Sequence, residues 1–83
     1  MEKQFSVHYR VNCRRLRDPL LGKLTAYGIS GSDHTGEHWR LARVFGDRIF
    51  AARIVFLLNK NQVSLLHADD VISDLLTGGT LLP

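Results

Sequence analysis

A cluster of basic residues near the N-terminal end is the clearest chemical feature of the sequence. Four arginines lie in the eight residues from Arg10 to Arg17, and Lys23 follows soon after. The planar guanidinium group hydrogen-bonds phosphate oxygens in pairs, and several together neutralise a run of phosphates. A solvated charged loop is the alternative interpretation. We expect a nucleic-acid or other polyanion surface formed by Arg10, Arg14, Arg15, Arg17, Lys23, Arg40 and Arg43.

A second candidate is a pair of histidines, His34 and His38, which stand four residues apart. This spacing places two imidazoles on one face of a helix, and the neighbouring carboxylates could add oxygen ligands for a metal. However, Gly36 and several other turn-forming residues surround the pair and disfavour a helix. We therefore expect a polar hairpin loop, with Trp39 anchoring the strand that follows, and no metal or cofactor.

Catalytic groupings are weaker. Cys13 and His8 could act as a nucleophile and a base, and His8, Tyr9 and Arg10 carry the groups that a metal-independent nuclease would need. A lone cysteine is more often an inert residue, and an alternating strand would place His8 and Tyr9 on opposite faces. The segment at residues 67–70, His-Ala-Asp-Asp, is better explained as the start of a helix than as a metal site. We predict that the protein is not an enzyme.

Length and composition indicate one small globular domain covering residues 1–83, with 45% hydrophobic and 23% charged residues. The single cysteine excludes a disulfide within the chain and a zinc site built from several thiolates, so a reducing, cytoplasmic location is expected. The charged N-terminus does not resemble a signal peptide. The longest apolar run, residues 49–58, contains Arg53 and is too short to cross a bilayer, so no membrane association is expected.

Charge is unevenly distributed along the chain. Residues 1–60 carry a net charge of +6, whereas residues 61–83 contain no lysine or arginine and carry −3. Such an asymmetry is compatible with binding to polyanions, and equally with head-to-tail pairing of two copies.

The elements that would position these residues begin with strands. Apolar and polar residues alternate over residues 4–12, which predicts a half-buried strand. Residues 14–19 break this alternation and are predicted to form a charged loop, because Pro19 disfavours helix at the preceding residue. Further strands are predicted at residues 20–29 and 37–45, separated by a glycine-rich loop.

Residues 48–58 can be either a strand or a helix, since they are apolar on nearly every side. We favour a strand, because Gly46 and Asp47 suit a two-residue hairpin turn before it and residues 59–62 suit a turn after it. A short fifth strand would then occupy residues 63–66.

The C-terminal region gives the clearest helix. Asp69 can cap its first turn, Asp70 adds favourable charge near the N-terminal end of the helix dipole, and Gly78 with Gly79 ends it. One apolar stripe follows the helical period and contains Val71, Ile72, Leu75 and Leu76.

Together these elements predict an α+β fold, in which a curved, mostly antiparallel sheet of four to five strands is closed by one C-terminal helix. One helix cannot cover both faces of such a sheet, so a homodimer or another apolar partner is expected, a view that the apolar tail at residues 81–83 also favours.

The expected function is that of a small non-enzymatic binding module that contacts nucleic acid or another polyanion through the basic loop. The alternative is an accessory or inhibitory protein, of the kind found in mobile elements or phages, that binds another protein. A small metal-independent nuclease is the least favoured function.

Overall fold

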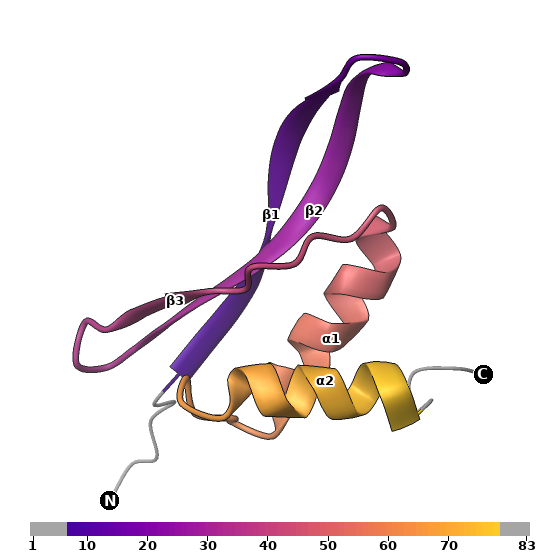
Figure 1. Ribbon diagram of the computed structural model, residues 1–83. Coiled ribbons are helices and arrows are strands. Elements are labelled where there is room, and N and C mark those ends of the chain that lie inside the picture. Colours follow the sequence, from indigo (N-terminus) through magenta and orange to yellow (C-terminus); the bar gives the residue numbers. More distant parts are fainter. Residues whose placement is uncertain (1–6, 79–83) are drawn as a thin grey trace, which may run out of the picture.

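The protein has an α+β fold in which a three-stranded antiparallel sheet, in the order β1-β2-β3, packs against two helices (Figure 1). The computed structural model describes residues 7–78. Its elements are β1 (Val7–Asp18), β2 (Gly22–Asp33), β3 (His38–Arg40), α1 (Arg48–Lys60) and α2 (Ala68–Gly78). The predicted class and the antiparallel sheet are confirmed, but the sheet has fewer strands than expected and a second helix is present.

Strands β1 and β2 form one long hairpin of 12 residues on each side, paired from Val7 and Asp33 to Asp18 and Gly22. The prediction of a charged loop at residues 14–19 is therefore wrong, because the chain stays extended to Asp18 and the turn is confined to residues 19–21. Asp18 organises this turn, since its Oδ1 accepts hydrogen bonds from the amides of Leu20 (2.8 Å) and Leu21 (2.9 Å). The hairpin extends far beyond the helices (Figure 1).

Residues 48–58 form most of α1, so the predicted fourth strand is wrong. Asp47 is the N-cap and not part of a hairpin turn: its Oδ1 accepts a hydrogen bond of 2.9 Å from the amide of Ile49. Such a cap satisfies an amide that has no partner within the helix. The predicted fifth strand at residues 63–66 is also wrong, since this segment is part of the connection between α1 and α2.

Strand β3 is shorter than the predicted strand at residues 37–45. After Arg40 the chain leaves the regular ladder, although Phe45 still forms an isolated bridge with Tyr27 through two hydrogen bonds of 2.7 and 2.8 Å. Residues 37–45 therefore remain beside β2, but only the first part pairs as a strand.

The hydrophobic core lies between one face of the sheet and the two helices. Trp39 is partly buried and packs edge-on against Tyr9, with ring centroids 5.7 Å apart, which fits its expected role as an anchor. The stripe predicted for α2 is confirmed, because Ile72 is buried and the other three members pack against the core. The core contains Val7, Tyr9, Ile29, Leu41, Phe45, Ala51, Ile54, Leu58, Ala68 and Ile72.

Two side-chain amides cover the outer edge of β1 where it passes the helices. The amide of Asn59 accepts from the backbone N–H of Tyr9 (2.8 Å) and donates to its carbonyl oxygen (3.0 Å). Gln62 does the same for Val7, at 3.2 and 3.0 Å. These amides take the place of peptide groups in a neighbouring strand, so they satisfy an edge that would otherwise be open to further pairing.

The molecule measures 55 × 31 × 18 Å along its principal axes, and the long hairpin accounts for this elongation (Figure 1). Among residues 7–78, no helix has the length and apolar character needed to cross a membrane. The predicted tail at residues 81–83, Gly79 and residues 4–6 of the first predicted strand lie outside the described residues.

Candidate nucleic-acid interface

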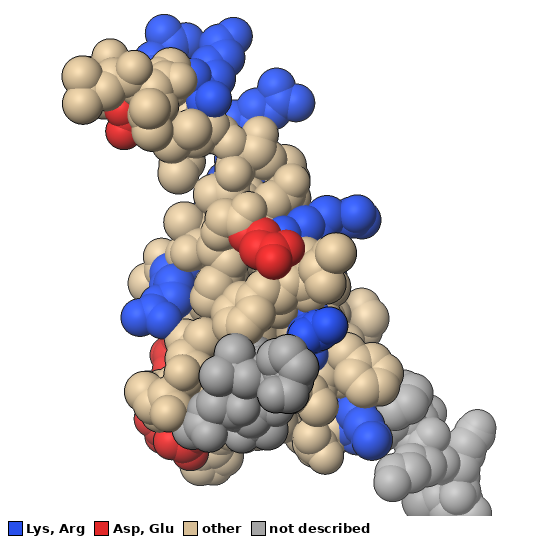
Figure 2. All heavy atoms as spheres, turned by 90° about the vertical axis from the view of Figure 1, so that its right-hand side faces the viewer, with Lys and Arg blue, Asp and Glu red and all other residues tan. Residues whose placement is uncertain are grey.

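The predicted basic cluster is carried by the projecting part of the hairpin. We call residues 13–25 the arm; it contains the distal parts of β1 and β2 and the turn that joins them. Lysine and arginine side chains gather at this end of the molecule (Figure 2). A loop was expected at this place, but the cluster lies on a protruding ribbon of two paired strands.

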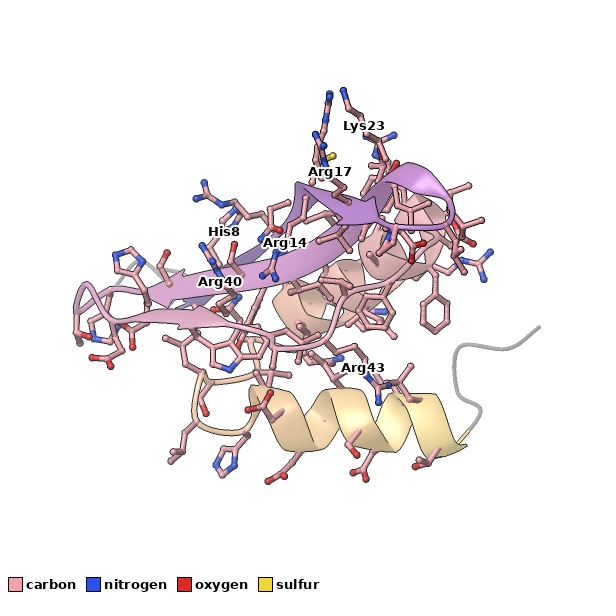
Figure 3. All side chains as sticks on the ribbon, turned by 45° about the horizontal axis from the view of Figure 1, so that its top comes forward. His8, Arg14, Arg17, Lys23, Arg40 and Arg43 are labelled. Atoms are coloured by element: carbon pink, nitrogen blue, oxygen red, sulfur yellow. The ribbon has the colours of Figure 1, made fainter. Side chains whose placement is uncertain are left out.

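Three of the four cations of the arm are grouped on one of its faces. Arg17 pairs directly with Lys23, and Arg15 is the next residue of β1 on the same face. Arg17 and Lys23 lie side by side in Figure 3. Like charges directly opposite each other on neighbouring strands destabilise a sheet, so a bound anion would relieve a repulsion that the folded chain contains. The arrangement leaves a shallow hollow of about 170 Å³ lined by Arg15, Leu16, Arg17 and Lys23.

Two further arginines lie on the face of the sheet that the helices leave open. Arg10 pairs with Ser30, and Ser30 pairs with Arg40, so the three residues form one row across the sheet. Because Tyr9 on the adjacent position is buried in the core, this row points away from the helices. In the next row His8 and His38 flank Ser32 in the same way.

We call this surface the open face. Along its middle, β2 presents only small residues, while arginine and histidine side chains rise from β1 and β3 on either side. His8, Arg14 and Arg40 lie on the side of the sheet opposite α2 (Figure 3). These small residues are Ala26, Gly28, Ser30 and Ser32; β3 borders only Ser30 and Ser32, and Ala26 and Gly28 are buried.

Arg14 lies in the arm, on the same face of β1 as Arg10, and so belongs to the open face. Its guanidinium group lies over Gly28, where an added Cβ would come within 3.1 Å of Arg14 Nε and 2.7 Å of Asn12 Oδ1. Nε donates a long hydrogen bond of 3.4 Å to Asn12 Oδ1, whereas Nη2 is buried without a hydrogen-bond partner. A buried donor without an acceptor costs free energy, so a phosphate oxygen reaching this group would supply what the protein lacks.

Arg43, the remaining predicted member, lies apart from the others. It stands on the helix side of the sheet, close to α2 (Figure 3). There it lines a separate hollow of about 200 Å³ together with Asp69, Ile72 and other residues of α2. The structure thus places six of the seven predicted residues on the sheet, in two groups on opposite faces, and separates Arg43 from both groups; the groups are Arg15, Arg17 and Lys23, and Arg10, Arg14 and Arg40.

The positive charge of this surface is not neutralised internally. Within residues 7–78, no basic side chain of the arm or the open face forms an ion pair. The one acid of the arm, Asp18, is held in the turn, where hydrogen bonds from the amides of Leu21 and Leu20 keep its pKa below the usual value of 3.8. Among the described residues, the cations of the arm and the open face therefore have no acidic partner.

The two histidines considered as metal ligands lie at the hairpin between β2 and β3, but the turn covers only residues 34–37, because Gly28 and Gly31 of the predicted glycine-rich loop belong to β2. Asp33 Oδ1 accepts hydrogen bonds from the amide and hydroxyl of Thr35 (3.0 and 2.6 Å) and from the amide of Glu37 (3.1 Å). The Thr35 hydroxyl is the main cause that lowers the pKa of Asp33. Across residues 7–78, no three His, Cys, Asp or Glu side chains gather in a way that could hold a metal ion.

The groupings considered for catalysis are dispersed by the fold. Cys13 is exposed on the arm, and His8 lies exposed on the open face. Tyr9 points into the core, where its hydroxyl donates a hydrogen bond of 2.6 Å to the carbonyl oxygen of Val63. Burial raises the pKa of Tyr9 to about 12, so this side chain stays neutral and acts in the structure of the core.

Sequence reasoning missed the leucines of the arm. The predicted strand at residues 20–29 begins with Leu20 and Leu21, but these two residues occupy the turn and are exposed, as are Leu16 and Leu24. The signal was present in the order Asp-Pro-Leu-Leu-Gly at residues 18–22, because aspartate, proline and glycine at these positions are typical of a tight turn.

Comparison with known proteins found no matching family model, no matching curated sequence and no matching solved structure. Any functional conclusion therefore rests on the geometry and charge of the arm and the open face.

Proposed function

We propose that the protein is a non-enzymatic nucleic-acid-binding module that contacts its ligand with the arm and the open face. The observation that carries this proposal is that one hairpin carries cations on both of its faces, with Arg17 and Lys23 on one face of the arm and Arg10 and Arg14 on the open face. A row of separated cations suits an extended polyanion, since each can meet a different phosphate.

The shape of the arm supports the same conclusion. Paired strands lie about 5 Å apart, and DNA-binding proteins place such ribbons of two strands in either groove of the duplex. An arm that stands away from the body can enter such a groove while the open face meets the adjoining backbone. Both surfaces belong to the same continuous hairpin, so their relative positions are fixed by β1 and β2.

The proposal can be tested with two variants of equal net charge. One carries Arg15→Gln, Arg17→Gln and Lys23→Gln on the arm; its control carries Arg48→Gln, Arg53→Gln and Lys60→Gln on α1. Each loses three positive charges, so a difference between them reports where the charges lie. Fluorescence anisotropy at low salt, with labelled duplex DNA, single-stranded DNA and RNA, measures the affinity.

We expect the arm variant to bind at least about 100-fold more weakly, because each lost phosphate contact removes a favourable electrostatic term. The control should stay within about threefold of the unmodified protein, since α1 lies on the side of the sheet opposite the open face. Equal losses in the two variants, or no binding of the unmodified protein to any of the three ligands, would contradict the proposal.

A second candidate function, binding to another protein or to a second copy, is favoured by the exposed side of α1. Ile49 and Phe56 are 66% and 62% exposed there, although both are large apolar residues. Beside Phe56 lies an apolar hollow of about 510 Å³ that also involves Val7 and Asn59. Exposed apolar patches commonly mark interaction surfaces, so the expected homodimer or protein partner is assigned to α1.

Sedimentation velocity tests this second function. A dimer formed through α1 should dissociate to monomers when Ile49→Ser and Phe56→Ser are combined, whereas the arm variant should remain dimeric. A monomer at all protein concentrations for the unmodified chain would rule out the homodimer.

A further inference from the structure

The tip of the arm combines exposed leucines with a rigid turn. Leu20 and Leu21 are 93% and 72% exposed, the highest values apart from Leu66 among the large hydrophobic residues between positions 7 and 78. Behind them, Leu16 and Leu24 face each other across the hairpin and are also exposed. Contacts with phosphates do not explain why four leucines are exposed here. The tip of the arm is instead suited to bury its leucine side chains against an apolar surface of a ligand.

The turn holds the two outermost leucines in place. Asp18 accepts hydrogen bonds from both of their amides, Pro19 restricts the backbone before them, and Gly22 adopts a φ of +83° that closes the turn. Because the backbone of the tip is already ordered, little conformational entropy remains to be lost when the leucines are buried by a ligand. The tip therefore has the properties of a wedge.

We propose that the ligand of the arm is duplex DNA, and that Leu20 and Leu21 insert between neighbouring base pairs and bend the duplex. This inference rests on the proposed nucleic-acid-binding function. Apolar side chains such as leucine enter DNA from the minor groove, partly unstack a base step and bend the helix by roughly 20–90°. Unstacking costs a few kcal/mol per step, and contacts of the flanking cations with phosphates offset that cost.

The arrangement of the cations agrees with this use of the tip. Arg17 and Lys23 stand immediately behind the turn, so phosphates bordering an opened base step would lie within their reach while the leucines are inserted. DNA that bends around the wedge would also approach the body of the protein. Arg10 and Arg40 on the open face are placed there to meet it.

An anionic bilayer also offers phosphates above an apolar layer, but it explains less of the surface. A flat membrane that receives the tip of a projecting arm would contact Arg15, Arg17 and Lys23 and leave the row of Arg10 and Arg40 away from the lipid. A long, bendable polyanion can reach both regions at once, which favours DNA.

Resonance energy transfer between dyes at the two ends of a duplex of about 30 base pairs tests the inference, because bending brings the ends together. The unmodified protein should increase the transfer, and more so when the centre of the duplex contains a flexible TA step. The variant Leu20→Ser, Leu21→Ser should bind with an affinity within about fivefold but give no increase. Circular dichroism confirms that this variant folds, and Leu66→Ser, another exposed leucine, is the control that should still bend DNA.

The outcomes separate the two levels of the proposal. The wedge proposal is wrong if the unmodified protein binds DNA tightly without bending it, or if the serine variant bends DNA equally. Either result would leave the proposed nucleic-acid-binding function intact. No binding to duplex DNA at low salt would overturn both. If the unmodified protein leaves DNA straight but binds phosphatidylserine vesicles, and the serine variant loses that binding, the tip is a membrane anchor and the wedge is wrong.

Discussion

At the scale of single residues, Tyr9 connects several parts of the core. It is 1% exposed, its hydroxyl donates to Val63, and its ring packs against Trp39. Its backbone N–H and carbonyl are both bonded to Asn59. Tyr9 thereby joins the sheet, the end of α1 and the connection to α2, which explains why a residue type suited to catalysis has a structural role here.

Replacing Tyr9 with phenylalanine should reduce the free energy of unfolding by about 1–3 kcal/mol at neutral pH, because the carbonyl of Val63 loses its donor. The pH dependence should change as well. The pKa of Tyr9 is raised from 10.0 to about 12 in the folded chain, so the unfolded state loses this proton first as pH rises. Stability from this group is complete below pH 10 and is lost between pH 10 and about 12.

Urea unfolding at a series of pH values measures both effects. The unmodified protein should lose more stability than Tyr9→Phe as pH rises through that range. Parallel profiles for the two proteins would contradict the assignment of a buried, neutral hydroxyl to Tyr9.

Two glycines of β2 make a matched pair for a second test. A Cβ at Gly31 would lie 2.6 and 2.8 Å from the ring of Tyr9, which is fixed in the core, so Gly31→Ala should cost about 1–3 kcal/mol of stability. At Gly28 the nearest atoms belong to the ends of the Asn12 and Arg14 side chains, which lie on the open face and can move. Gly28→Ala should therefore unfold in urea nearly as the unmodified protein does. Equal destabilisation by the two changes would contradict the packing described for Tyr9.

At the scale of elements, the sequence predicts some parts well. Alternation at residues 7–12 identifies β1, and the apolar stripe at Val71, Ile72, Leu75 and Leu76 identifies α2, because each element has one face in the core and one in solvent. Residues 48–58 do not have one core face and one solvent face that the sequence pattern could reveal. They are apolar on several sides, so periodicity cannot separate strand from helix, and the choice depends on whether Asp47 ends a turn or caps a helix.

In the candidate interface, too, some features can be predicted from the sequence and others cannot. The cluster of cations is visible in the sequence, since residue type alone identifies it. Its placement on a strand, and the separation of Arg43, depend on how the chain pairs beyond residue 13, which local sequence does not specify. The role of Asn59 and Gln62 is equally hidden, because their partners on β1 lie 50 and 55 residues away.

One substitution can remove the Asn59 side chain, which hydrogen-bonds the outer edge of β1. Asn59→Ala should lower the free energy of unfolding by about 1–3 kcal/mol, because the N–H and carbonyl of Tyr9 both lose their partner. It should also favour aggregation through the uncovered edge. Asn61→Ala is the control, since the Asn61 side chain bonds only the carbonyl of Leu57 in its own helix. Urea unfolding and light scattering that give the same result for both variants would contradict a specific edge-covering role.

At the scale of the whole molecule, basic and acidic residues are concentrated at opposite ends of an elongated fold. The cations of the arm stand at one end, and the exposed acids of α2, Asp69, Asp70 and Asp74, lie at the other (Figures 1 and 2). An elongated molecule with such a distribution turns its basic end toward a polyanion and keeps its acidic end away. Head-to-tail pairing of two copies, arm against α2, is the competing use of the same asymmetry.

The most direct test of the central claim is the salt dependence of DNA binding for the arm variant and the α1 control. A plot of log K against log salt has a slope of about −0.9 for each phosphate contacted on duplex DNA. The slope for Arg15→Gln, Arg17→Gln, Lys23→Gln should therefore be less steep than that of the unmodified protein by about 2–3. No such change is expected for the control, whose net charge is the same. Equal slopes for the two variants would show that the arm does not contact the phosphates and would contradict the account.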